Sequence, residues 1–262
     1  MAAAWRRRPL RGSFLAQSRP SVATTAQADR ASALRQIAAG FCLALGVALL
    51  VLAVPRTIAA WEAIPAGLPL EKVSGGQRPT TTELRDGVGA LRRSVAVIAS
   101  GHRLVELGTL EFQQTLEMLP NNPARGALLE ISEADLISGL KDNSADGGAW
   151  YRLAQVRQSR NAPPREVAAA LMRSLDMAPN MRWLWLARAR SFYAYASILQ
   201  EDELLAVRSQ FRTIWRSDLS LRQPLLWAAD AQGNMELLSS ALERDAEANS
   251  ELQALQRGTP PK

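Results

Sequence analysis

Cysteine and histidine are nearly missing from this sequence, and their scarcity excludes several kinds of site. The 262 residues include one cysteine, Cys42, and one histidine, His102. A single cysteine cannot form a disulfide within the chain, and a metal site with two or more histidine or cysteine ligands is impossible. Because Cys42 lies inside an apolar run, a catalytic Cys–His pair outside that run is also excluded.

Glycine-rich phosphate loops are missing as well. The pairs Gly75-Gly76 and Gly147-Gly148 belong to neither a GxxxxGK[ST] nor a GxGxxG motif. The acidic cluster Glu201-Asp202-Glu203 stands where carboxylates stabilise a helix N-terminus. A lone His102 at a helix junction is typical of a surface residue. We therefore predict a protein that is not an enzyme, with no catalytic residues, no cofactor and no bound metal.

Excess positive charge is confined to one end of the chain. The formal net charge is +6, and residues 1–36 contain seven arginines and one acid, Asp29. The remaining residues hold 24 basic and 24 acidic side chains and are neutral overall. Nucleic-acid binding needs positive charge on the folded part, so this distribution predicts no nucleic-acid partner. It indicates that residues 1–36 form a disordered, arginine-rich cytoplasmic arm.

Residues 37–54 form an apolar run without any charge. A helix of that length spans roughly 27 Å, close to the hydrocarbon thickness of a bilayer. We interpret the run as a single transmembrane helix in a bacterial inner membrane. The arginine bias predicts a cytoplasmic N-terminus and a periplasmic C-terminal domain. The alternatives are a signal peptide cleaved near Ile58-Ala59-Ala60 and a buried core helix.

The chain after the run divides into a linker, a helical domain and a tail. Glycines and prolines over residues 55–79 indicate the linker. Thr80 and Glu83 have the spacing of a capping box, and apolar residues then recur at helical intervals. We expect an all-α domain over residues 80–250 and a disordered tail over 251–262. The expected helices begin near residues 80 and 102 and then cover 124–140, 146–159, 164–177, 181–197, 201–216, 222–230 and 234–247.

Internal repetition indicates how these helices pair. A tryptophan, a leucine and an alanine recur at an offset of 33 residues: Trp150, Leu153 and Ala154 return as Trp183, Leu186 and Ala187. A looser instance starts at Trp227. With the intervening segment 174–180, this pattern resembles a tetratricopeptide (TPR) repeat, whose period is about 34 residues. Three departures from that pattern are the longer loop at Pro163-Pro164, Arg157 in place of the usual aromatic residue, and the region 188–222, which is longer than one repeat. A generic bundle of helical hairpins is the alternative.

The TPR resemblance implies antiparallel helical hairpins packed on a repeat core. The predicted core residues are Trp150, Leu153, Ala154, Leu171, Leu175, Trp183, Leu186 and Ala187. The order of an N-terminal anchor, helical pairs and the stretch Phe211–Asp218 also resembles small proteins associated with bacterial exopolysaccharide assembly. That second resemblance implies a scaffold in the cell envelope, with protein partners in a membrane-associated complex for polysaccharide assembly or export.

Aromatic and arginine side chains crowd the segment 181–197 on all sides, so they cannot all face one core. We predict a partner-binding groove lined by Trp185, Arg188, Arg190 and Tyr193. Core packing is the alternative for the aromatic residues. Two other functions are left open. One is a mitochondrial inner-membrane assembly factor whose arm is a cleaved transit peptide, and the other is a glycan-acting envelope enzyme.

Overall fold

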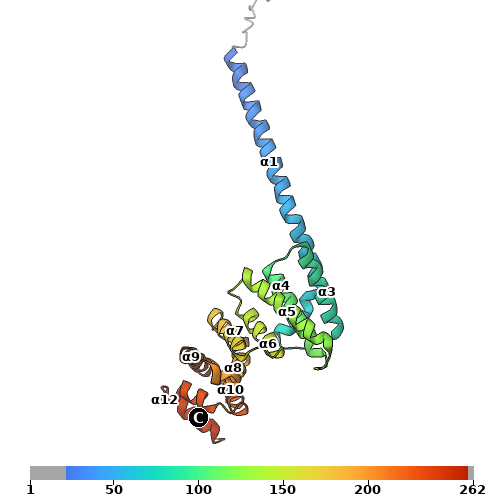
Figure 1. Cartoon of the computed structure of the whole chain (residues 1–262). Helices are drawn as coiled ribbons and strands as arrows, with labels where there is room; N and C mark the ends of the chain where they lie inside the picture. Colours follow the sequence, from blue (N-terminus) through green and yellow to red (C-terminus); the bar gives the residue numbers. More distant parts are fainter. Residues whose placement is uncertain (1–21, 259–262) are drawn as a thin grey trace, which may run out of the picture. The chain divides into compact units, whose positions relative to one another are not determined.

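Every regular element in the described part of the chain is a helix, which confirms the predicted all-α class (Figure 1). The computed structural model describes residues 22–258 and gives side-chain surroundings from residue 35 onward. The chain divides between Val54 and Pro55 into two units, and each is described by itself. Residues 1–21 of the predicted arm and 259–262 of the predicted tail lie outside the described residues.

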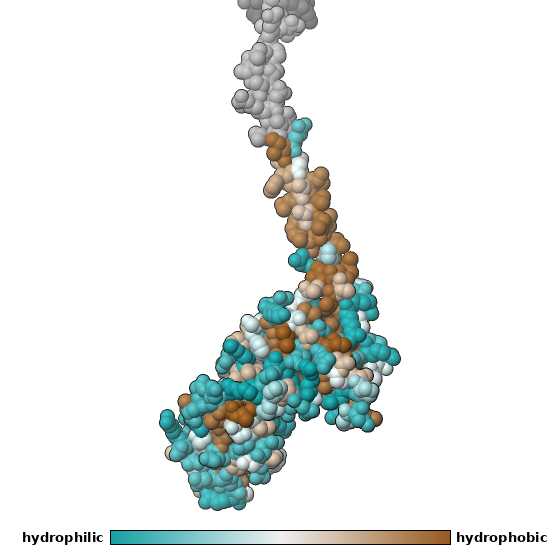
Figure 2. Space-filling view, in the orientation of Figure 1, coloured by the Kyte–Doolittle hydropathy of each residue, from teal (hydrophilic) through white to brown (hydrophobic). Residues whose placement is uncertain are grey.

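The first unit holds most of helix α1 (Val22–Glu62). The side chains of its apolar run, residues 37–54, are exposed and form the long brown segment of Figure 2. Among the described helices, α1 alone is long and apolar enough to cross a membrane. It also includes residues 22–36, which were predicted to be disordered. Most of that stretch is alanine, glutamine, arginine or leucine, and these residues favour helix.

The predicted linker, residues 55–79, is instead largely helical and packed. After α1 come the 3-10 helix η1 (Ile64–Ala66) and helix α2 (Gly67–Ser74). Alanines at helical spacing give this segment a narrow face that packs closely on the next helix, and Pro65 lies at the start of η1, where proline is tolerated. The buried alanines are Ala59, Ala63 and Ala66.

The later helices follow most of the predicted positions. Thr80 and Glu83 form the predicted capping box, with the Thr80 amide donating to the Glu83 carboxylate at 2.7 Å. The bounds are α3 (Thr81–Val97), α4 (Gly101–Glu117), α5 (Pro123–Asp142), α6 (Gly147–Ser159), α7 (Pro164–Met177), α8 (Arg182–Tyr195), η2 (Ala196–Ile198), α9 (Glu201–Ser217), α10 (Leu219–Ala231), α11 (Met235–Leu242) and α12 (Ala246–Gln256).

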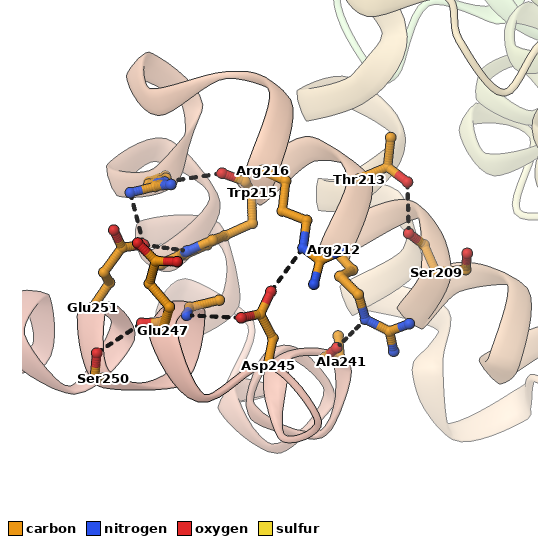
Figure 3. Close-up of polar contacts among 12 residues, drawn as sticks. Ser209, Arg212, Thr213, Trp215, Arg216, Ala241, Asp245, Glu247, Ser250 and Glu251 are labelled. Atoms are coloured by element: carbon orange, nitrogen blue, oxygen red, sulfur yellow. Dashed lines mark hydrogen bonds and ion pairs between the residues drawn. The ribbon is translucent and has the colours of Figure 1, made fainter.

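The C-terminal helices differ from the prediction. The expected helix 234–247 ends at Leu242, and α12 extends into the segment predicted as a disordered tail. Asp245 explains the break, because its carboxylate accepts a hydrogen bond from the Ala248 amide at 3.2 Å and pairs with Arg216 of α9 at 2.7 Å (Figure 3). Trp215 adds a hydrogen bond from Nε1 to Glu251 at 3.1 Å. These contacts dock α12 on α9.

One polar contact recurs between helices that pack on each other. A fully buried serine donates from its hydroxyl to a backbone carbonyl of an alanine or glycine on the helix packed against it. A small residue on the opposite helix lets the two backbones approach this closely. The three contacts are Ser94 to Ala59 at 2.7 Å, Ser132 to Gly108 at 2.7 Å and Ser174 to Gly147 at 2.5 Å.

The second unit buries two apolar clusters. The smaller cluster joins η1 to α3 and α4 and includes Ala66, Leu84 and Leu110. The larger cluster extends from Phe112 of α4 to Leu252 of α12. Helix α8 crosses the larger cluster, so its orientation decides which of its side chains are available at the surface.

Candidate protein-interaction surface

Helix α8 turns one face to the core and one face to solvent. Three of the four residues predicted to line a groove are on the core side: Trp185 is 4% exposed, and Arg188 and Tyr193 are fully buried. They share this side with Leu184 and Phe192, as a period of 3.6 residues per turn requires. The groove prediction is therefore corrected for these three residues, which pack inside the domain.

Arg188 keeps its charge inside the core by binding oxygen atoms at the end of α7. Its Nη1 donates to the carbonyl of Ala178 at 2.7 Å, and its Nη2 and Nε donate to the carbonyl and hydroxyl of Ser174 at 2.7 and 2.9 Å. Desolvation lowers the pKa of Arg188 to about 10, so the side chain stays protonated at neutral pH. Arg188 thus adds charge-assisted hydrogen bonds to carbonyls at the helix end, each of which also accepts a backbone amide at 3.3 Å.

The other two buried groove residues have packing roles. Trp185 donates from Nε1 to the carbonyl of Pro179 at 2.9 Å. The ring of Tyr193 lies 4.8 Å from that of Phe211, centroid to centroid. Burial raises the pKa of the Tyr193 phenol, which therefore stays neutral.

The predicted repeat core also divides between the interior and the surface. Trp183 is 56% exposed, and Leu186 and Ala187 are half-buried. Trp150 is half-buried too, and its Nε1 donates to the carbonyl of Ser144 at 2.8 Å. The predicted core residues that are buried are Leu153, Ala154, Leu171 and Leu175. Trp150 and Ala187 pack against the larger apolar cluster, so Trp183 is the recurring tryptophan that lies mainly at the surface.

Trp183, Leu186 and Arg190 form the solvent side of this helix, which we call the open face of α8. Trp183 and Arg190 are about two turns apart and so point to the same side. Trp183 borders a hollow of about 320 Å³ between α2, α4 and α6, which we call the Trp183 hollow. Its apolar lining includes Leu70, Val73, Val105 and Ala149.

Arg152 supplies positive charge to the Trp183 hollow. Its guanidinium lies 5.7 Å from the centroid of the Phe112 ring, and Nη1 donates to Gln155 Oε1 at 2.7 Å. Within the described residues Arg152 has no ion pair, and desolvation lowers its pKa to about 10. The carboxylates of Glu71, Glu106 and Asp146 also border this hollow, so its electrostatic character is mixed.

A second hollow lies where α8 meets α10, and we call it the Trp227 hollow. Its volume is about 290 Å³, and Trp227 on its wall is 65% exposed. Arg190 is the charged residue of the lining, and no carboxylate is among the lining residues. Arg190 is thus the one predicted groove residue that lines a surface hollow. The other lining residues are Pro224, Ala228, Ala231 and Gln232.

A carboxyl pair, with Glu111 fully buried and Asp135 half-buried, lies in another part of the domain, between α4 and α5. Arg92 donates from Nη2 and Nε to Oε1 of the fully buried Glu111 at 2.8 and 3.2 Å, while Oε2 has no hydrogen-bond partner in the described structure. Desolvation raises the pKa of Glu111 to about 7, against the lowering effect of Arg92, and burial also raises the pKa of Asp135 beside it. A proton shared between Glu111 and Asp135 would satisfy Oε2.

The open face of α8 and its two hollows offer exposed tryptophan, apolar walls and arginine. Such a composition suits the binding of another polypeptide, because tryptophan and arginine dominate the energetics of protein interfaces. No group of three or more histidine, cysteine, aspartate or glutamate side chains is placed to hold a metal ion in the described part of the chain. No protein-family model, curated protein or solved structure matches the chain.

Proposed function

We propose that this protein is a membrane-anchored, non-enzymatic scaffold that holds a protein partner beside a bacterial inner membrane. The open face of α8 and the adjoining Trp227 hollow carry the proposal, because Trp183 and Trp227 are both more than half exposed. Burying each indole against a partner would remove a large apolar surface from water. A solitary domain gains nothing from leaving these two side chains in solvent.

The same proposal includes the membrane crossing and the TPR-like arrangement. Residues 37–54 of α1 would cross the bilayer, with the helical domain in the periplasm. Close pairs of helices, each joined by a buried serine, support a hairpin architecture of the TPR kind. Polysaccharide assembly or export in the envelope is the process that the resemblance of the layout favours. Neither the mitochondrial nor the glycan-enzyme alternative gains a specific observation.

Photo-crosslinking in living cells tests the scaffold function. A photoreactive phenylalanine analogue replaces Trp183 in one variant and exposed Arg244 of the full chain in a matched control, since Arg244 lines neither hollow. We expect one specific protein to be captured from position 183 and not from position 244. Capture of the same background proteins from both positions would contradict the proposed role of this face.

A fusion reporter tests the membrane orientation. An enzyme that is active only in the periplasm is attached after Lys262 of the full chain. We expect activity in intact cells and co-sedimentation of the full-length fusion with membranes. An inactive reporter on a membrane-bound fusion reverses the orientation, and a soluble shortened fusion indicates cleavage after the apolar run.

A further inference from the structure

The Trp227 hollow differs from the Trp183 hollow in the charge that it presents. Three carboxylates border the Trp183 hollow, whereas the lining of the Trp227 hollow has the guanidinium of Arg190 and no acid. Its remaining lining is apolar apart from Gln232. An uncompensated cation against an apolar wall selects for a ligand with negative charge next to an apolar group.

Other arginines on the same two helices already have partners. Arg182 of α8 pairs with Asp218 at 2.7 Å, and Arg222 of α10 pairs with Glu251 at 2.7 Å. Arg190 has no ion pair within the described residues, although it lies between these two pairs along the chain. Its guanidinium is exposed and keeps all its donors available for an incoming carboxylate.

We propose that the Trp227 hollow binds a partner-protein segment that places a large apolar side chain on the Trp227 indole and an adjacent carboxylate on the Arg190 guanidinium. This inference rests on the proposed scaffold function and names the chemistry of the partner. A planar guanidinium can hold a carboxylate with two parallel hydrogen bonds, and this geometry gives direction as well as affinity. The indole supplies the apolar contact area that makes a hot spot.

Charge decides among the possible occupants. Residues 1–36 of this chain carry seven arginines and one acid, so they repel Arg190 rather than complement it. The segment 259–262, Thr-Pro-Pro-Lys, contains no acidic side chain. A second copy of the chain offers an exposed acid–apolar pairing on α9, at Asp202 and Leu205, but such a contact joins unlike surfaces and would build rings or open chains of molecules, which the light-scattering measurement below detects. A separate partner protein is therefore favoured.

Selection from a displayed library of random short peptides tests the inference. The target is the full chain in a mild detergent, as wild type and as the variants R190E, W227A and R244E. We expect the wild type to enrich peptides that join aspartate or glutamate to a tryptophan, phenylalanine or leucine. R190E should weaken a selected peptide by about tenfold or more, because it places like charges together. W227A should weaken it to a similar extent, and R244E should leave it unchanged.

Four results overturn the inference. These are no enrichment of acidic residues, equal weakening by R190E and R244E, full affinity in W227A, and a concentration-dependent self-assembly in light scattering that W227A abolishes. Circular dichroism of each variant establishes that the helices are intact. The photo-crosslinking from Trp183 is independent of this selection. If position 183 captures a partner but the selected peptides are not enriched in acidic residues, the scaffold function stands and the proposed ligand of the Trp227 hollow is wrong.

Discussion

The two faces of α8 differ in a way that hydrophobicity alone does not explain. One face buries a charged side chain, Arg188, beside Trp185, while the other leaves Trp183 in solvent beside Arg190. Arg188 is accommodated because the end of α7 supplies three acceptor interactions, whereas Trp183 is only partly covered, at the edge of the hollow between α2, α4 and α6. The environment provided by neighbouring helices therefore decides burial here. Substitution of two residues of the same type that have different surroundings tests this comparison.

The two tryptophans of α8 should respond most differently. W185A removes a buried indole from the core and should lower the free energy of unfolding by about 3–5 kcal/mol. W183A removes an exposed indole and should change it by less than about 1 kcal/mol. Urea unfolding of the full chain in a mild detergent, followed by circular dichroism, measures both. Equal losses in the two variants would show that the two faces are not distinct.

Substitutions of Arg188 and Arg190 should give the next largest difference in the free energy of unfolding. R188A removes three buried hydrogen bonds to the end of α7 and creates a cavity, so we expect the free energy of unfolding to fall by about 3 kcal/mol. R190A should stay within about 0.5 kcal/mol of the wild type, because its side chain is exposed. The same urea midpoints provide the measurement. A negligible effect of R188A would mean that water or a rotated side chain replaces those hydrogen bonds.

Glu111 makes the stability of the domain dependent on pH. The pKa of Glu111 in the folded state is raised to about 7 from the ordinary 4.5. The stabilisation that protonated Glu111 gives the folded domain is therefore fully present below about pH 4.5 and is lost as the pH rises through about 7. Full loss of the proton corresponds to about 3 kcal/mol. The urea midpoint should therefore be higher at about pH 5 than at about pH 8. E111Q should abolish most of that difference, and E117Q, at an exposed position on the same helix, should preserve it.

Substitutions of two glycines of α5 should give the smallest difference in the free energy of unfolding. A Cβ at Gly139 would lie 2.6 Å from the carbonyl oxygen of Gly101 and 2.7 Å from Val105 Cγ2, whereas a Cβ at Gly126 would have no such atom within 4 Å. G139A should therefore lower the free energy of unfolding by about 1–3 kcal/mol. G126A should raise it by about 0.5–1 kcal/mol, because alanine restricts the unfolded chain and favours helix. Stabilisation by both substitutions would show that α4 and α5 can separate at little cost.

Local sequence signals predicted most helices and missed particular segments. Periodic apolar residues and the Thr80–Glu83 capping box marked α3, and similar patterns marked the helices after it. Helix α2 was missed because prolines and glycines between residues 65 and 76 were interpreted as breaks, although Pro65 lies in η1 and Pro69 in the first turn of α2. The tail prediction failed because docking of α12 depends on Asp245 and Glu251 meeting α9, which is far away in sequence.

The surface was harder to predict than the helices. Arg188 interrupts the apolar side of α8, so the sequence pattern favoured the side with Trp183, Leu186 and Ala187 as core. The burial of an arginine depends on acceptors from α7, which no local period of α8 encodes. Arg190 was identified from the sequence, but its hollow requires Trp227 of α10. Local patterns could predict the helix itself, but they could not predict which side chains of α8 contact residues of other helices.

The contact between the end of α1 and α3 has a mechanical consequence. The two segments run in opposite directions, because Ala59 meets Ser94 whereas Ala66 lies against Gly87. If residues 37–54 are held in a bilayer while a partner pulls on the domain, the force enters along this pair of helices. The Ser94 hydrogen bond and the Arg93–Glu62 ion pair then both oppose the separation of α1 from α3.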